Sequence, residues 1–127
     1  MTTWVNDGFV GQLFTLTGSF MPAPPAGAQP ATLWGVESHI NDVFGAVGAT
    51  PGIERQIVDF DFQSVEDAVG QYAESFGPIV SARATLEPSG RWEEFIAAFR
   101  DLVARCNSAD DGTARLRSDY FVVLVQR

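Results

Sequence analysis

The sequence predicts an α+β fold, in which a few-stranded sheet packs against several helices. Residues 53–62 alternate apolar and acidic side chains, with the period of two that is typical of a half-buried strand. Trp92–Cys106 carries an apolar stripe at helical spacing, and Ala114–Val125 ends in a continuous apolar run. The chain has 127 residues and is 46% hydrophobic, which is enough for one modest core. We therefore expect a single domain over residues 1–127.

The first third of the chain predicts one helix and one extended crossing. Asn6 or Asp7 is placed to cap a helix with an apolar face, which glycines weaken by about 1 kcal/mol each. The face consists of Phe9, Val10, Leu13, Phe14 and Thr17, and the glycines are Gly8, Gly11 and Gly18. Residues 21–30 include four prolines, which remove backbone donors and fix φ. This segment is therefore expected to be a proline-rich, extended crossing loop.

The middle of the chain predicts helices on either side of the strand at 53–62. Residues 37–44 form a short amphipathic segment that should bury Ile40, Val43 and Phe44 and end at Gly45. Ser64 is a good cap for a helix that Gly77-Pro78 should end. Residues 79–86 are ambiguous between helix and irregular structure. The last strand is apolar at odd and even positions from Tyr120 to Val125, which predicts a strand covered on both faces.

Composition excludes several classes of function. Sixteen acidic residues oppose eight arginines, and no lysine is present, so the net charge is −8. Such a chain repels phosphate backbones and anionic lipid, and we expect it to bind neither nucleic acid nor membrane. The single cysteine, Cys106, cannot form an intramolecular disulfide, and no apolar run is long enough to span a bilayer. These features predict a cytoplasmic protein.

Motifs for catalysis, cofactor binding or metal binding are not found. There is no G-x-G-x-x-G pattern, and Gly45-Ala46-Val47-Gly48 follows a helix rather than a strand. His39 is the only histidine, and we expect it on a surface or in a helix contact. Cys106 lies on an apolar stripe and should behave as a small buried hydrophobe. The acidic residues near residues 59–67 alternate on a strand or begin a helix, so they do not converge on a metal. We therefore assign no catalytic, cofactor or metal residue.

Two motifs carry a resemblance to a known family. Residues 4–14 have the sequence W-V-N-D-G-F-V-G-Q-L-F, and Ala31–Gly35, after the prolines, has A-T-L-W-G. Together they resemble the segment after the fifth sheet strand of class I S-adenosylmethionine-dependent methyltransferases of the UbiE-like, small-molecule type. The resemblance covers essentially the whole chain. It implies a largely antiparallel sheet in which the seventh strand lies between the fifth and the sixth.

The resemblance also implies a role for four aromatic residues. The segment after the fifth strand helps to cover the methyl acceptor in such enzymes, and aromatic walls suit an apolar acceptor. Trp4, Phe9, Phe14 and Trp34 are therefore the candidate substrate-binding residues. The alternative, that each belongs to the hydrophobic core, stays open.

Two functions follow as hypotheses. In the first, the chain is the C-terminal portion of a methyltransferase and forms part of the acceptor pocket. It binds no S-adenosylmethionine alone, because its partner, an N-terminal half or split-gene subunit, holds that cofactor. In the second, the chain is an independent module that binds a small apolar ligand or dimerises on a remnant scaffold. In either case we expect self-association through the edge of the last strand, from Tyr120 to Val125, because too little of the fifth strand is expected to remain to cover it.

Overall fold

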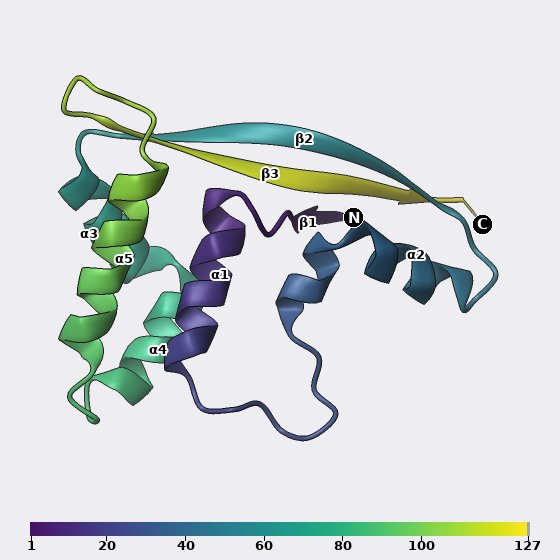
Figure 1. Cartoon of the computed structure of the whole chain (residues 1–127), viewed down its shortest axis with the longest axis horizontal. Helices are drawn as coiled ribbons and strands as arrows, with labels where there is room; N and C mark the ends of the chain where they lie inside the picture. The colour runs from purple at the N-terminus through teal and green to yellow at the C-terminus, as the bar shows by residue number, and fades with distance from the viewer. Residues whose placement is uncertain (127) are drawn as a thin grey trace.

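The structure, a computed structural model that describes residues 1–126, has the α+β architecture expected from the sequence (Figure 1). Arg127, the end of the expected domain, lies outside the described residues. In chain order the elements are β1 (Thr2–Trp4), α1 (Phe9–Phe20), the 3-10 helix η1 (Ala31–Gly35), α2 (Glu37–Gly45), β2 (Pro51–Phe62), α3 (Val65–Ser75), α4 (Gly77–Leu86), α5 (Trp92–Cys106) and β3 (Ala114–Val125). None of the helices within residues 1–126 combines the length and the apolarity that crossing a bilayer requires.

The sheet has the order β1-β3-β2, and both pairings are antiparallel. β2 and β3 form a long ribbon of 12 residues each, while β1 pairs only with the second half of β3. The pairing extends to Met1, whose amino group donates to the Val123 carbonyl at 2.8 Å while the Val123 N–H donates to the Met1 carbonyl at 2.8 Å. The last strand of the chain is therefore the central strand of the sheet.

This pairing corrects the expectation of an open edge at the last strand. From Tyr120 to Val123 the edge of β3 opposite β2 is occupied by the N-terminal segment, so these backbone groups are not free to pair with another chain. The predicted burial of both faces is also wrong. Leu124 is 67% exposed and Val125 is 37% exposed.

The burial of β3 changes face along its length. Leu116 and Ser118 are buried near its start, whereas Phe121 and Val123 are buried near its end. Successive side chains of a strand point to opposite faces, so one face is covered at one end and the other face at the other end. Helices α1, α3, α4 and α5 gather at the first end, and α2 with η1 lies at the second (Figure 1).

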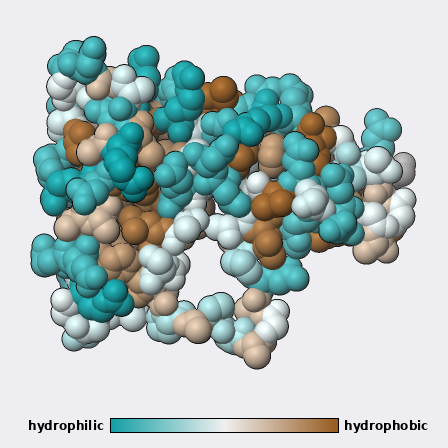
Figure 2. All heavy atoms as spheres, viewed as in Figure 1, coloured by the Kyte–Doolittle hydropathy of each residue, from teal (hydrophilic) through white to brown (hydrophobic). Residues whose placement is uncertain are grey.

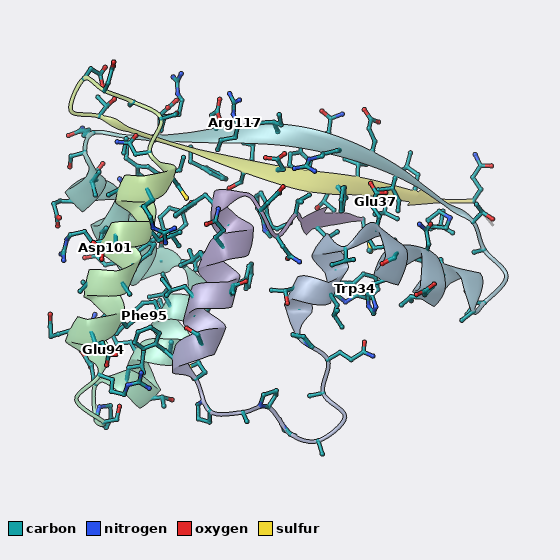
Figure 3. The ribbon with its side chains drawn as sticks, in the orientation of Figure 1. Trp34, Glu37, Glu94, Phe95, Asp101 and Arg117 are labelled. Carbon is teal, nitrogen blue, oxygen red and sulfur yellow. The ribbon has the colours of Figure 1, made fainter. Side chains whose placement is uncertain are left out.

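The predicted amphipathic helix Trp92–Cys106 is confirmed as α5, with the expected bounds. Its side chains Phe95, Phe99 and Val103 are all fully buried in the larger of two hydrophobic clusters. Figure 3 labels Phe95 on α5 with Glu94 and Asp101, both of which are exposed on the same helix. α5 is therefore the main core helix.

Other helix termini differ from the sequence expectations in part. The Ser64 hydroxyl caps α3 as predicted and accepts from the Asp67 N–H at 3.0 Å. Gly77-Pro78, expected to be a helix end, is also the start of α4, because proline is well tolerated in a first helical turn. The cap of α1 is Gly8 rather than Asn6 or Asp7.

Two further expectations can be compared with the structure. The strand predicted at residues 53–62 is confirmed, since β2 covers Pro51–Phe62. The helix predicted at 37–44 is confirmed as α2, but Val43 is 38% exposed, so its predicted burial is wrong. The proline-rich segment 22–30 is exposed and has no helix or strand.

Candidate functional site

The candidate site is centred on Trp4, the last residue of β1. The short strand is held in place at both ends, because the Val5 N–H donates to the Asp119 carbonyl at 2.9 Å and Met1 bonds to Val123. Trp4 lies opposite Tyr120 in the ladder and lines two adjoining hollows. We call them the sheet hollow and the helix hollow.

The sheet hollow has a volume of about 280 Å³ and lies over the face of the sheet that carries Trp4. The Trp4 ring centroid is 6.2 Å from that of Phe60 and 6.0 Å from that of Tyr120, both in edge-on or tilted arrangements. Such offset aromatic contacts are favourable and fix the ring orientations. The lining consists of Thr2, Thr3, Trp4, Val58, Phe60 and Tyr120.

The helix hollow has a volume of about 290 Å³ and lies between β1, α1 and η1. Its aromatic walls are Trp4, Phe14 and Trp34, and Asn6 contributes a side-chain amide. The complete lining is Met1, Thr2, Thr3, Trp4, Asn6, Gly11, Phe14, Ala31, Thr32 and Trp34. In Figure 2 an opening separates the body of the molecule from the proline-rich segment. Figure 3 labels Trp34 on η1, beside this opening.

Two glycines bring the walls of the helix hollow together. A Cβ at Gly11 would lie 2.2 Å from the Val5 carbonyl oxygen, and one at Gly35 would lie 2.5 Å from the Trp4 carbonyl oxygen. Real Cβ atoms essentially never approach another heavy atom within 3.0 Å. α1 and η1 can therefore contact the backbone of Val5 and Trp4, respectively, only because both positions lack a side chain.

The structure brings together three of the four sequence-predicted site residues. Trp4, Phe14 and Trp34 all line the helix hollow. Phe9 instead lies in the core with 1% exposure, and its ring centroid is 5.3 Å from Tyr72 and 6.4 Å from Phe99. For Phe9 the structure therefore favours the alternative interpretation as a core residue.

The sequence prediction does not include Asn6, Thr32, Phe60 and Tyr120, which all line the hollows. The sequence indicates Asn6 only as a helix cap, and Phe60 and Tyr120 only as strand residues. The sequence contains a signal for Asn6, because it directly follows the strand that ends at Trp4. It contains none for Phe60, which reaches the site only through the pairing of β2 with β3.

The polar character of the two hollows is weak. Their linings include Asn6 and several threonines, and the ionisable groups of the lining residues are the Tyr120 phenol and the Met1 amino group, which donates to the Val123 carbonyl. Pockets with apolar walls and a few orienting polar groups are typical of sites for small, uncharged molecules. The geometry therefore favours a planar, apolar ligand over an anionic or cationic one.

The histidine, the cysteine and two acidic side chains of β2 lie outside the hollows and take part in packing or ion pairs. The His39 ring centroid lies 5.4 Å from that of Trp34, edge-on, as expected for a helix contact. Cys106 is partly buried against the core, and burial raises the pKa of its thiol, which disfavours the nucleophilic thiolate. Asp59 and Asp61 are paired with Arg117 at 3.0 Å and Arg115 at 2.7 Å.

The remaining acidic side chains of that segment are engaged at the start of α3. Glu66 is paired with Arg100 at 2.6 Å. Asp67 accepts from the Gln71 side chain and from the Gln63 N–H, and these bonds lower the pKa of its carboxyl. Across residues 1–126, no group of three or more His, Cys, Asp or Glu side chains is arranged to hold a metal ion.

Comparison with known proteins gives no further assignment. Neither the scan against protein-family models nor the search of curated proteins produced a match for this chain.

Proposed function

We propose that this chain forms the acceptor-binding part of a small-molecule methyltransferase, and that the cofactor S-adenosylmethionine is held by a separate N-terminal half. The observation that carries the proposal is the strand order β1-β3-β2. It matches the order that the resemblance implies, if β1 is the end of the fifth strand, β2 the sixth and β3 the seventh. A central last strand is not an ordinary outcome of consecutive hairpins, since sequential strands usually lie side by side.

The position of the hollows supports the same proposal. In open α/β sheets, ligands bind beyond the carboxyl ends of the parallel strands. Trp4 is the carboxyl-terminal residue of β1, and both hollows adjoin it. Within residues 1–126, β3 is the only strand that pairs with β1. A parallel strand of the cofactor-binding half would pair with the outer edge of β1 and place its cofactor beside Trp4.

The described residues do not fit the cofactor by themselves. Neither lining offers a carboxylate for ribose hydroxyls. In the first turn of α1 the Val10 N–H is already engaged, because it donates to the buried Ser118 hydroxyl at 3.1 Å. A site on this chain would need both features, so we assign it only the methyl acceptor.

The roles of this chain's residues follow from the geometry of the helix hollow. Trp4, Phe14 and Trp34 would enclose a planar apolar acceptor and exclude water from it. The Asn6 amide and the Thr32 hydroxyl would orient the acceptor by hydrogen bonds. Positioning of this kind can supply a large part of the rate acceleration in a transfer between two bound molecules.

Two measurements test the proposal. We expect calorimetric titration of 2-naphthol into the chain to show saturable binding. Trp34→Ala should weaken that binding about tenfold, the effect of losing one aromatic wall. Trp92→Phe is the matched control, because Trp92 packs on Phe95 at a centroid distance of 5.6 Å, away from both hollows. Its affinity for naphthol should equal that of the wild type.

The second measurement is methyl transfer. The chain is co-expressed with the polypeptide encoded directly upstream of Met1, and transfer of a labelled methyl group from S-adenosylmethionine to naphthol is measured. The proposal is supported if the complex transfers the methyl group to naphthol, if Trp34→Ala abolishes this transfer and if Trp92→Phe does not. A complex that binds both molecules and transfers no methyl group contradicts it.

A second candidate is an independent module that binds a small apolar ligand. It is favoured by the helix hollow, whose lining comes entirely from residues 1–34 of this chain. Cooperative unfolding of the chain alone and an affinity for naphthol that the upstream polypeptide does not change would favour this candidate over the first.

A further inference from the structure

The outer edge of β2 is the longest unoccupied backbone edge among the described residues. β2 has 12 residues and lies at the border of the sheet, and within residues 1–126 it pairs only with β3 (Figure 1). Edge strands are commonly protected by proline, by a bulge or by charged side chains, lysine above all. The charged residues of β2, which are Glu54, Arg55, Asp59 and Asp61, are of both signs and can therefore pair with those of a second copy. After Pro51, which stands at the first position, residues 52–62 contain neither proline nor lysine, and all 12 residues of β2 pair in continuous register with β3.

Strand geometry restricts how a second copy of β2 could pair with this edge. The N–H and C=O groups directed away from β3 come from every second residue of β2, and the side chains of every second residue share a face. When two copies of β2 pair antiparallel, odd-numbered residues therefore lie opposite odd-numbered residues, and even-numbered opposite even-numbered. The possible registers place Gln56, Ile57 or Val58 on the two-fold axis, or shift further by one residue at a time.

The register with Ile57 on the axis is complementary in charge and pairs the exposed apolar side chain of β2 with itself. With Ile57 on the axis, Ile57 lies opposite Ile57 of the second copy, and Arg55 lies opposite Asp59 in both halves of the ladder. Ile57 is 55% exposed, and Arg55 and Asp59 flank it on the same face of the strand, so pairing with a second Ile57 removes apolar surface from water. All three side chains are on the face that carries Arg117, which Figure 3 shows projecting away from the helices.

The neighbouring registers leave the exposed Ile57 opposite a charge. With Val58 on the axis, Arg55 still lies opposite an acid, Asp61, but Ile57 lies opposite Asp59. With Gln56 on the axis, Ile57 lies opposite Arg55.

The register centred on Ile57 also has a mismatch, because Ile53 lies opposite Asp61. Ile53, however, is already packed in the smaller hydrophobic cluster, whereas Ile57 is exposed. Of the three registers, only this one pairs the exposed Ile57 with an apolar side chain and Arg55 with an acid, and both kinds of cross-strand pair are stabilising.

The covering helices also permit this pairing. Ile53 belongs with Ile40 and Phe44 of α2 to the smaller hydrophobic cluster, on one face of the sheet. Phe62 packs against Tyr72 of α3, on the opposite face, with a ring centroid distance of 5.7 Å. With the axis at Ile57, Ile53 of one copy lies beside Asp61 of the other. At this place α2 of the first copy covers one face of the joined sheet and α3 of the second copy covers the opposite face, so the two helices do not collide.

We infer that two copies of this chain associate through β2, antiparallel and centred on Ile57, to form one continuous six-stranded sheet. The inference does not rest on the proposed function, since it concerns the outer backbone edge of β2, whereas β1 lies at the other border of the sheet and the sheet hollow includes only the side chains of Val58 and Phe60 from β2. It relocates self-association from the edge at Tyr120 to Val125, which β1 covers over most of its length, to the edge of β2.

A charge-swap experiment tests both the interface and its register. Arg55→Asp places Asp opposite Asp59 twice, and Asp59→Arg places Arg opposite Arg55 twice. We expect each variant to raise the dimer dissociation constant about tenfold or more in sedimentation equilibrium, through the loss of two pairs and the gain of two repulsions. An equimolar mixture of the two variants restores both opposite-charge pairs, so it should dimerise about as tightly as the wild type. The double variant should do the same alone.

Controls separate this effect from changes within one chain. Arg55 also pairs with Asp119 at 2.7 Å, and Asp59 pairs with Arg117. The double variant leaves these intrachain repulsions in place, so its recovery can come only from contacts between chains. Arg115→Asp changes the net charge by the same amount as Arg55→Asp, but on β3, one strand inside the edge. It should therefore leave the dimer intact. A monomeric wild type, a mixture that stays monomeric, or an equal loss with Arg115→Asp would each overturn the inference.

Discussion

Gly11 offers the sharpest test of how the candidate site is built, because a single methyl group there meets the backbone. The Cβ of Gly11→Ala would lie 2.2 Å from the Val5 carbonyl oxygen and 2.6 Å from the Asn6 Cα. To reach even 3.0 Å, α1 and the end of β1 must separate by at least about 0.8 Å. Overpacking of this kind costs about 1–3 kcal/mol, and it outweighs the gain of about 0.5–1 kcal/mol for replacing glycine by alanine within a helix.

Gly18 provides the matched control in the same helix. A Cβ at Gly18 has no heavy atom within 4 Å, so Gly18→Ala should stabilise the chain by about 0.5–1 kcal/mol. Urea unfolding followed by circular dichroism measures both variants, and naphthol titration shows whether the helix hollow changes with Gly11→Ala. If Gly11→Ala stabilises the chain as much as Gly18→Ala does, α1 does not approach Val5 closely, and the helix hollow is not shaped by this contact.

Three further outcomes are expected. Phe99→Ala should lower the free energy of unfolding by about 3–5 kcal/mol, since Phe99 is fully buried. Leu124→Ala, at an exposed position, should change it by less than about 0.5 kcal/mol. Equal losses for the two variants in urea unfolding would contradict the assignment of α5 as the core helix. Burial raises the pKa of Tyr72 to about 12, above its ordinary value of 10.0, so the unfolded chain loses this proton first and stability should fall between about pH 10 and pH 12. Tyr72→Phe should flatten the pH dependence of its midpoint for urea unfolding in that range, and an unchanged slope would count against the raised pKa. Calorimetric titration of S-adenosylmethionine into the chain alone should show no saturable binding tighter than about 100 μM, and a tighter isotherm would contradict a cofactor site on a separate half.

Periodicity predicted the segments in which burial stays on one face. α5 has one covered face along its length, so its apolar residues recur at a period of 3.6. In β2 the partly buried side chains alternate from Gln56 to Phe62, and this part of the strand has the period of 2.0 by which the sequence locates it. The helix Gly77–Leu86 was harder to recognise. A Gly-Pro pair can end one helix, and it also suits the first turn of the next helix. The neighbouring residues do not show which of the two structures forms.

Features that depend on contacts between distant segments were not predictable in this way. The apolar residues from Tyr120 to Val125 suggested burial on both faces, but the ribbon passes from one set of covering helices to another and exposes Leu124. Gly11 was interpreted as a residue that weakens a helix, whereas its lack of a side chain is required by Val5, six residues earlier. Trp4, Phe14 and Trp34 were chosen from a resemblance, and only the folded chain shows that they line one hollow while Phe9 does not.

The central position of β3 also has a consequence for how this chain folds during synthesis. Thr2 pairs with Val122, and the whole of β2 likewise pairs with β3, so no strand of the sheet has a partner until the last element has been made. At a synthesis rate of about 5–20 residues per second, β1 waits roughly 6–24 s for the residues that complete its ladder. During that time the helices α1, α3, α4 and α5 can pack through their shared core, while Trp4 and the β2 edge stay exposed to solvent. We therefore expect the sheet to close last during synthesis, and aggregation to compete with folding in the interval before closure.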